Sequence, residues 1–149
     1  MTKSLPPKSL VLYADDDADD RELIKDAFEE YASIIELKMF ERGADLLHFL
    51  HQIMPLQPAP CLIILDINMP GLDGKQTLRR IRSLDNFEDV PVVLFTTSTL
   101  PAEAAFAQSH NAGFVTKPLH GNQIQFILHQ LIDHCTDEIK EKFRRHREN

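Results

Sequence analysis

Short apolar segments alternate with amphipathic segments along this chain, and that alternation restricts its fold more than any other feature. Apolar runs of strand length occupy five ranges: 10–14, 35–40, 61–65, 90–95 and 113–116. Between and after these runs, apolar residues recur at helical spacing, as Leu46, Leu50 and Ile53 do. We therefore predict five strands that are separated by helices.

The strict order of strand, helix and strand predicts an α/β fold built on a doubly wound parallel sheet. Each right-handed crossover lays its helix across the sheet. We expect a five-stranded parallel sheet with helices on both faces. The helix before the last strand has the weakest support, namely Pro101 and the alanine-rich stretch 102–107.

Polar side chains stand where four of the predicted strands end. Asp15 and Asp16 follow the first strand, Asp66 the third, Thr96 the fourth and Lys117 the fifth. Ligands of open parallel sheets bind beyond the carboxyl ends of the strands. We therefore expect these five side chains to form one site.

Three of these groups are carboxylates, and carboxylates that share a crevice repel one another. A hard divalent cation would neutralise Asp15, Asp16 and Asp66, and ligands that offer only oxygen favour Mg²⁺ over zinc or copper. The alternative is that the acidic run only caps the first helix. We assign that role to the acidic residues that follow the pair, which are Asp17, Asp19 and Asp20.

Once a metal is present, Asp66 can attack phosphorus and become an aspartyl phosphate. The Lys117 ammonium can then pair with the phosphoryl oxygens, and the Thr96 hydroxyl can donate to them. A lysine or a threonine at a strand end is usually just solvated surface. Their joint positions beside Asp66 favour phosphoryl transfer.

These motifs resemble the receiver domain of two-component response regulators, including single-domain regulators related to the chemotaxis and phytochrome-associated ones. They are the acidic pair Asp15-Asp16, the segment 62–74, the hydroxyl turn 95–98 and the segment 114–118. The resemblance covers about 10–135. It implies a receiver domain with the flavodoxin-like doubly wound fold there, an N-terminal extension at 1–9, and a C-terminal helical extension at 136–149 with no output domain.

The resemblance also implies the metal site. Asp66 would accept the phosphoryl group, Asp16 would bind Mg²⁺ directly, and Asp15 would help through a bound water. The backbone carbonyl of Asn68 would complete the protein's share of the metal ligands, with Asp66 as a further ligand.

For signalling, the resemblance makes Thr96 the switch hydroxyl, Lys117 the phosphate-pairing cation and Phe114 the aromatic side chain that turns inward on activation. The donor would be a sensor histidine kinase or a histidine phosphotransfer protein, and the output a protein target. Such a chain is a signalling protein rather than an enzyme, although it could promote its own phosphorylation and dephosphorylation. Asn68 and Ser98, two residues after the acceptor and the switch, leave the phosphoryl lifetime open.

Two other functions are considered. A pseudo-receiver would keep the fold as a binding module without phosphorylation, and the intact Asp66, Thr96 and Lys117 argue against it. An aspartyl-phosphate phosphatase commonly has an aspartate two residues after the nucleophile, where this chain has Asn68. No insertion of the size of a cap domain is present either, so we rank the phosphatase low.

The composition of the chain limits the classes of protein to which it can belong. The 149 residues suit one domain, and the formal charge of −7 argues against nonspecific nucleic-acid binding. Cys61 and Cys135 show no metal-site spacing, so we interpret both as reduced packing residues. No apolar run reaches the length of a signal peptide or a membrane span. We expect a cytoplasmic protein that does not contact a membrane.

The end of the chain continues a helical stripe from Leu128 to Phe143 with a basic flank. This stripe has two interpretations. Its apolar residues either fold back on the body of the domain or, together with the last strand-helix units, form a homodimer contact.

Overall fold

The fold is a single parallel sheet of five strands. The computed structural model describes residues 8–53, 59–118 and 123–148. The strands are β1 (Ser9–Ala14), β2 (Ile35–Phe40), β3 (Leu62–Leu65), β4 (Val92–Thr96) and β5 (Gly113–Thr116). Their order is β2-β1-β3-β4-β5, and every neighbouring pair is parallel. The predicted doubly wound α/β fold is confirmed.

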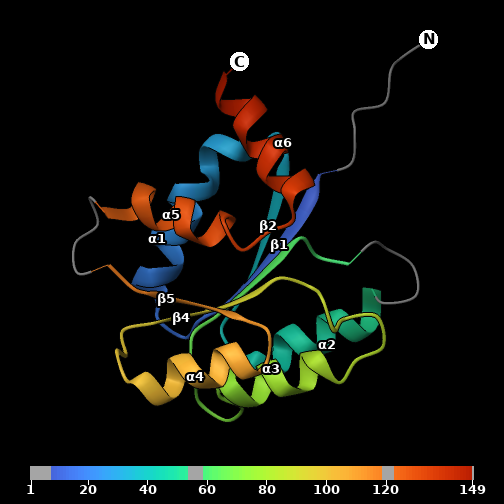
Figure 1. Ribbon diagram of the computed structural model, residues 1–149, viewed down its shortest axis with the longest axis vertical. Coiled ribbons are helices and arrows are strands. Elements are labelled where there is room, and N and C mark those ends of the chain that lie inside the picture. Colours follow the sequence, from blue (N-terminus) through green and yellow to red (C-terminus); the bar gives the residue numbers. More distant parts are fainter. Residues whose placement is uncertain (1–7, 54–58, 119–122, 149) are drawn as a thin grey trace.

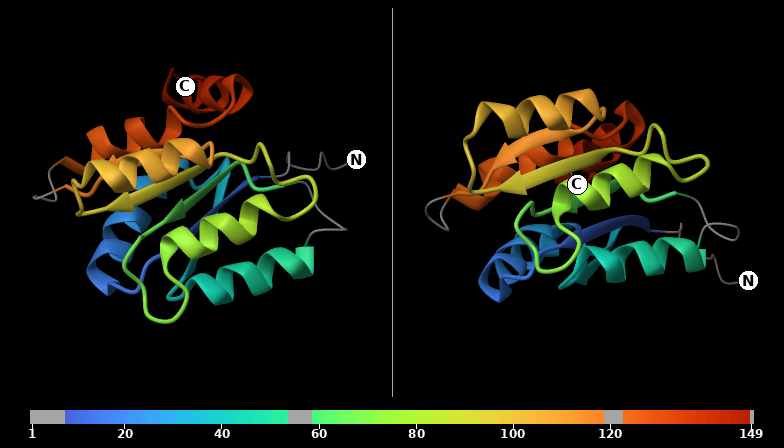
Figure 2. Two further views of the ribbon diagram at one scale, coloured as in Figure 1. Left: turned by 60° about the horizontal axis from the view of Figure 1, so that its bottom comes forward. Right: turned by 90° about the horizontal axis from the view of Figure 1, so that it is seen from below.

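Helices cover both faces of this sheet. They are α1 (Ala18–Phe28) with the short 3-10 helix η1 (Glu29–Tyr31), α2 (Gly43–Ile53), α3 (Gly74–Arg82), α4 (Pro101–Ser109), α5 (Ile124–Ile132) and α6 (Asp137–Glu148). Figure 1 shows α1, α5 and α6 on one side of the sheet and α2, α3 and α4 on the other. Figure 2 shows α2, α3 and α4 lying side by side across their face.

The central strands have apolar side chains on both faces, which gives the domain two cores. In β1, Tyr13 packs into the core beneath α1 and α5, whereas its neighbour Leu12 packs into the core beneath α2 and α3. All four residues of β3 are buried. A strand that is covered on both sides reads as a continuous apolar run, which is why its sequence shows no alternation.

Two strands are shorter at their beginning than predicted. The fourth was expected from residue 90 but starts at Val92, since Pro91 has no N–H to contribute to the sheet. The third was expected from Cys61 but starts at Leu62. The weakly supported helix at Pro101 is confirmed as α4, with the proline in its first turn.

The C-terminal stripe is divided between two helices. Helix α5 ends at Ile132, and α6 begins at Asp137 after a turn. Phe143 of α6 is 1% exposed, and its ring centroid lies 4.6 Å from that of Tyr31 and 6.5 Å from that of Phe28. The extension therefore folds back on the body of the domain, which was one of its two interpretations. The homodimer contact stays a prediction.

The outer end of α6 is also attached by polar contacts. The Lys142 ammonium donates to the Ser9 hydroxyl at 2.8 Å, and His146 Nε2 lies 2.7 Å from the Glu30 carbonyl oxygen.

None of the described helices combines the length and the apolar character needed to cross a membrane. The predicted extension at 1–9 lies mostly outside the described residues.

Replacing Phe143 by alanine tests the packing of α6. Loss of this buried ring should lower the free energy of unfolding by about 3 kcal/mol, measured by urea denaturation. The matched control is Phe126→Ala, because the Phe126 side chain is 66% exposed. The control should cost about 0.5 kcal/mol or less. Equal effects in the two variants would contradict the packing described for α6.

Candidate functional site

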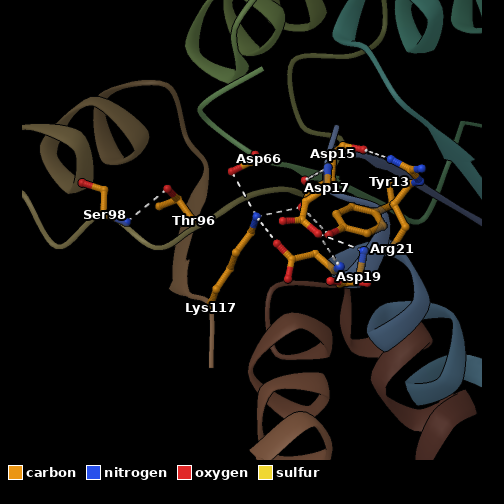
Figure 3. A network of polar contacts seen from close by, with 10 residues as sticks. Tyr13, Asp15, Asp17, Asp19, Arg21, Asp66, Thr96, Ser98 and Lys117 are labelled. Atoms are coloured by element: carbon orange, nitrogen blue, oxygen red, sulfur yellow. Dashed lines mark hydrogen bonds and ion pairs between the residues drawn. The ribbon is translucent and has the colours of Figure 1, made fainter. Parts of the chain in front are cut away.

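The predicted polar residues do gather at the carboxyl edge of the sheet (Figure 3). Asp15 directly follows β1 and Asp66 directly follows β3, and both side chains are buried. Thr96 is the last residue of β4 and is fully buried. Lys117 directly follows β5 and is 8% exposed, while Asp16 is exposed. Four of these five polar side chains are therefore mostly shielded from water, and Asp16 is the exposed one.

The three carboxylates predicted to bind metal lie together. One oxygen atom from each of Asp15, Asp16 and Asp66 lies within 4.8 Å of the others. A hard divalent cation prefers this set of ligand atoms, because all are oxygens and most carry negative charge. The residues present thus fit a divalent metal ion.

Lys117 supplies the positive charge of the site. Its Nζ lies 2.7 Å from Asp20 Oδ2, 2.8 Å from Asp15 Oδ2 and 3.4 Å from Asp66 Oδ1. Burial alone would lower the pKa of Lys117, but hydrogen bonds to Asp15 and Asp20 and the charges of Asp15 and Asp66 raise it well above its ordinary value. Lys117 is therefore a permanent ammonium.

Asp66 carries negative charge that this ammonium does not fully offset. Burial and then the charge of Asp15 raise the pKa of Asp66 to about 6, although Lys117 acts in the opposite direction. A bound cation would stabilise the ionised carboxylate. The electrostatics of the pocket therefore also fit a divalent metal ion.

Asp15 is held by groups that the sequence analysis missed. The buried Tyr13 hydroxyl donates to Asp15 Oδ2 at 2.5 Å, and the Asp17 N–H donates to Oδ1 at 2.9 Å. Arg21 Nη1 donates to the Asp15 carbonyl oxygen at 2.8 Å. Strand alternation puts Tyr13 and Asp15 on one face, so the sequence held a signal for the first of these contacts.

The acidic residues that follow the pair lie at the start of α1. Asp17 is the N-cap of α1, and its side chain accepts from the N–H groups of Asp19 and Asp20. Asp19 and Asp20 lie in the first turn of α1, as predicted for carboxylates at a helix N-terminus, and the Asp20 carboxylate also accepts a hydrogen bond from Lys117 at 2.7 Å. That partner lies 97 residues away in sequence, and local spacing carries no signal for it.

Of the two residues predicted to switch, Thr96 ends β4 at this edge, whereas Phe114 lies within β5. The Thr96 hydroxyl accepts from the Ser98 N–H at 3.2 Å, and no described hydrogen bond joins it to Asp66 or Lys117. Phe114 lies opposite Leu94 in the sheet and is half-buried. Their roles in switching, like the metal-binding role of the Asn68 carbonyl, stay predictions.

The loop after Asp66 is closed tightly by Gly74. A Cβ atom at Gly74 would lie 2.2 Å from the Asp66 carbonyl oxygen and 2.8 Å from Ile67 Cα. Only glycine allows α3 to begin this close to the end of β3. Asp73 caps α3 in a capping box with Gln76, which fixes the other side of the loop.

A family comparison agrees with this geometry. The model for the response regulator receiver domain matches residues 11–129, which include every predicted site residue. The chain belongs to this family. Neither the pseudo-receiver nor the phosphatase is favoured.

Curated relatives of this receiver domain include response regulator Rcp1 from Synechocystis sp., which is 35% identical over 98 residues. The match covers 64% of this chain and 66% of Rcp1. A protein-glutamate methylesterase/protein-glutamine glutaminase from Trichodesmium erythraeum is 32% identical over 133 residues, or 85% of this chain but only 36% of the relative. The similarity therefore supports a signalling protein, and no enzymatic domain is shown.

Solved structures support the same fold. The Mn²⁺-bound form of Rcp1 has a TM-score of 0.71 and 26% identity, with 81% of this chain and 91% of that chain covered. The phosphorylated cyanobacterial phytochrome response regulator RcpA has a TM-score of 0.76 and covers 87% of this chain and 98% of its own, but at 23% identity it shows the fold alone. Both of these structures are of response regulators, which agrees with the family match of this receiver domain.

The raised pKa of Asp66 predicts a pH-dependent gain from Asp66→Asn in metal-free protein. The native state binds the Asp66 proton more tightly than the unfolded chain, so stability is lost as the pH rises from the ordinary carboxyl pKa of 3.8 to about 6, and the full cost is present above that pH. The asparagine variant should be more stable than the parent by roughly 1–3 kcal/mol near pH 8, and the gain should vanish near pH 4. Urea denaturation in the presence of a chelator measures both values.

The control for this experiment is Glu36→Gln, which removes an exposed carboxylate from β2. It should change stability by about 0.5 kcal/mol or less at either pH. A loss of stability in Asp66→Asn near pH 8 would contradict the electrostatics described for the site.

Proposed function

We propose that Asp66 accepts a phosphoryl group from the phosphohistidine of a sensor kinase or phosphotransfer protein. The observation that carries this proposal is the convergence of three carboxylates, within 4.8 Å of one another, beside one buried ammonium. A structural ion pair needs only one carboxylate per cation. Three carboxylates beside one ammonium leave an excess of negative charge around Asp66. A divalent cation can bind to this excess and bridge the Asp66 carboxylate to the negatively charged phosphoryl group of the donor.

The metal is proposed to be Mg²⁺, held by Asp16, Asp66 and the Asn68 carbonyl, with Asp15 acting through a water. When bound, it would offset the charge of the phosphoryl oxygens. A carboxylate oxygen of Asp66 attacks phosphorus, the P–O bond forms, and the P–N bond to the donor imidazole breaks. Lys117, permanently protonated, pairs with the phosphoryl oxygens as the new charge arrives.

The signal is proposed to leave through the surface of β4, β5 and the helices that follow them. The Thr96 hydroxyl, now accepting from Ser98, would turn toward the phosphoryl group, and Phe114 would move into the space so freed. A protein target would recognise the changed surface, and a second copy of the chain would bind through the same face. No nucleic-acid contact is proposed, and the cytoplasmic location stays a prediction.

Phosphorylation is tested by intact-mass measurement after incubation with acetyl phosphate, a small chemical donor. The parent chain should gain the mass of one phosphoryl group in the presence of Mg²⁺ and none with a chelator. Asp66→Asn should gain none, since an amide cannot act as the nucleophile. Asp85→Asn is the control, because Asp85 is an exposed residue and should leave labelling unchanged. An unlabelled parent would favour the pseudo-receiver, and a labelled Asp66→Asn would move the acceptor elsewhere.

Metal binding is tested separately by thermal unfolding with and without Mg²⁺. A ligand that binds only the native state at a hundred times its Kd stabilises by about 2.7 kcal/mol, so the melting temperature should rise measurably. Asp16→Asn should lose most of this rise, because it removes an exposed carboxylate of the cluster. Asp19→Asn should retain it, since Asp19 lies outside the cluster. An equal loss in both variants would indicate general charge screening instead of a site.

A further inference from the structure

Asp20 makes the shortest contact with the lysine of the site. The distance from Lys117 Nζ to Asp20 Oδ2 is 2.7 Å, compared with 2.8 Å to Asp15 and 3.4 Å to Asp66. Asp20 belongs to the first turn of α1, whereas Lys117 follows β5 at the far side of the sheet. The contact therefore joins a helix to a strand end that neither sheet pairing nor chain connectivity brings together.

Asp20 acts on the lysine rather than on the metal site. Among the residues that the structure describes, the group that could hold a metal consists of Asp15, Asp16 and Asp66. The Asp20 side chain is 26% exposed, whereas the Lys117 side chain to which it is paired is 7% exposed. A helix N-terminus would account for an acidic residue here, but not for a carboxylate aimed at Lys117.

An ammonium group has three N–H donors, so the Asp20 carboxylate affects how many of them the Lys117 ammonium has left for other partners. The Lys117 ammonium donates to Asp20 at 2.7 Å and lies 2.8 Å from Asp15, whereas Asp66 is 3.4 Å away, beyond the length of a strong charge-assisted bond. The Phe95 ring lies below the ammonium, 5.8 Å from it. The lysine is thus held on two sides and only loosely engaged on the side of the acceptor.

We infer that Asp20 is a positioning residue, which holds the Lys117 ammonium back from Asp66 and so keeps one donor available for a phosphoryl group arriving there. The part of this inference that concerns the phosphoryl group rests on the function proposed above. Without Asp20, the ammonium would have Asp15 and Asp66 as its remaining carboxylate contacts and would move toward the acceptor. A tighter ion pair would then mask the nucleophile and occupy the donor that transfer requires.

The restraint itself is tested by proton NMR of the lysine ammonium groups in ¹⁵N-labelled protein, with the Lys117 signal identified by its absence in Lys117→Met. In the parent chain this signal should exchange slowly with water. Asp20→Ala should speed the exchange several-fold, and Asp20→Asn should restore slow exchange because its amide oxygen still accepts a hydrogen bond. Asp19→Ala is the matched control, since it removes the neighbouring charge of the same helix turn without touching Lys117.

The consequence for transfer is tested with acetyl phosphate at saturating Mg²⁺ for each variant. The initial labelling rate of Asp20→Ala should fall roughly tenfold, because a misplaced catalytic group loses much of its effect. Asp19→Ala should keep the parent rate, and Asp20→Asn should recover most of it. Circular dichroism verifies that all variants are folded.

The two arms separate failure of the inference from failure of the proposed function. Unchanged ammonium exchange in Asp20→Ala would overturn the inference, whatever the labelling shows. Faster exchange with an unchanged labelling rate would overturn the claim that the restraint serves transfer. A parent chain that takes no label would overturn the proposed function, while the NMR arm would still decide whether Asp20 restrains Lys117.

Discussion

The buried ammonium of Lys117 among carboxylates is the interaction on which the rest of the site depends. Because β4 lies between β3 and β5, Lys117 must extend across the end of β4 to reach Asp66 and Asp15. Near the end of β4, the Lys117 ammonium lies over the Phe95 ring, 5.8 Å from its centroid. Sheet order, strand lengths and the length of a lysine side chain together determine the distances within the pocket.

The carboxylates outnumber the cation, and this imbalance links stability to function. A buried carboxylate such as Asp66, whose pKa is raised to about 6, is a destabilised anion, and a bound cation or a proton relieves that destabilisation. The tight closure at Gly74 and the hydroxyl of Tyr13 keep the carboxylates from moving apart. The fold thus holds three carboxylates close together although their charges repel one another.

Sequence patterns predicted the parts of this site that follow from strand ends. The positions of Asp15, Asp66 and Lys117 could be read because each directly follows an apolar run, and parallel strands end at one edge. Asp20 could not, because its contact depends on where α1 lies relative to β5. The fold-back of α6 was likewise undecided, since an apolar stripe shows that Phe143 needs a partner but not whether the same chain supplies it.

The central claim is that these residues form one phosphoryl site, and a crystal structure with Mg²⁺ and beryllofluoride, a phosphoryl mimic, tests it most directly. We predict a mimic bound to the Asp66 carboxylate, a cation among Asp16, Asp66 and the Asn68 carbonyl, and mimic contacts from Lys117 and Thr96. A mimic bound at another residue, or a pocket in which Lys117 stays with its carboxylates and no mimic binds, would contradict the claim.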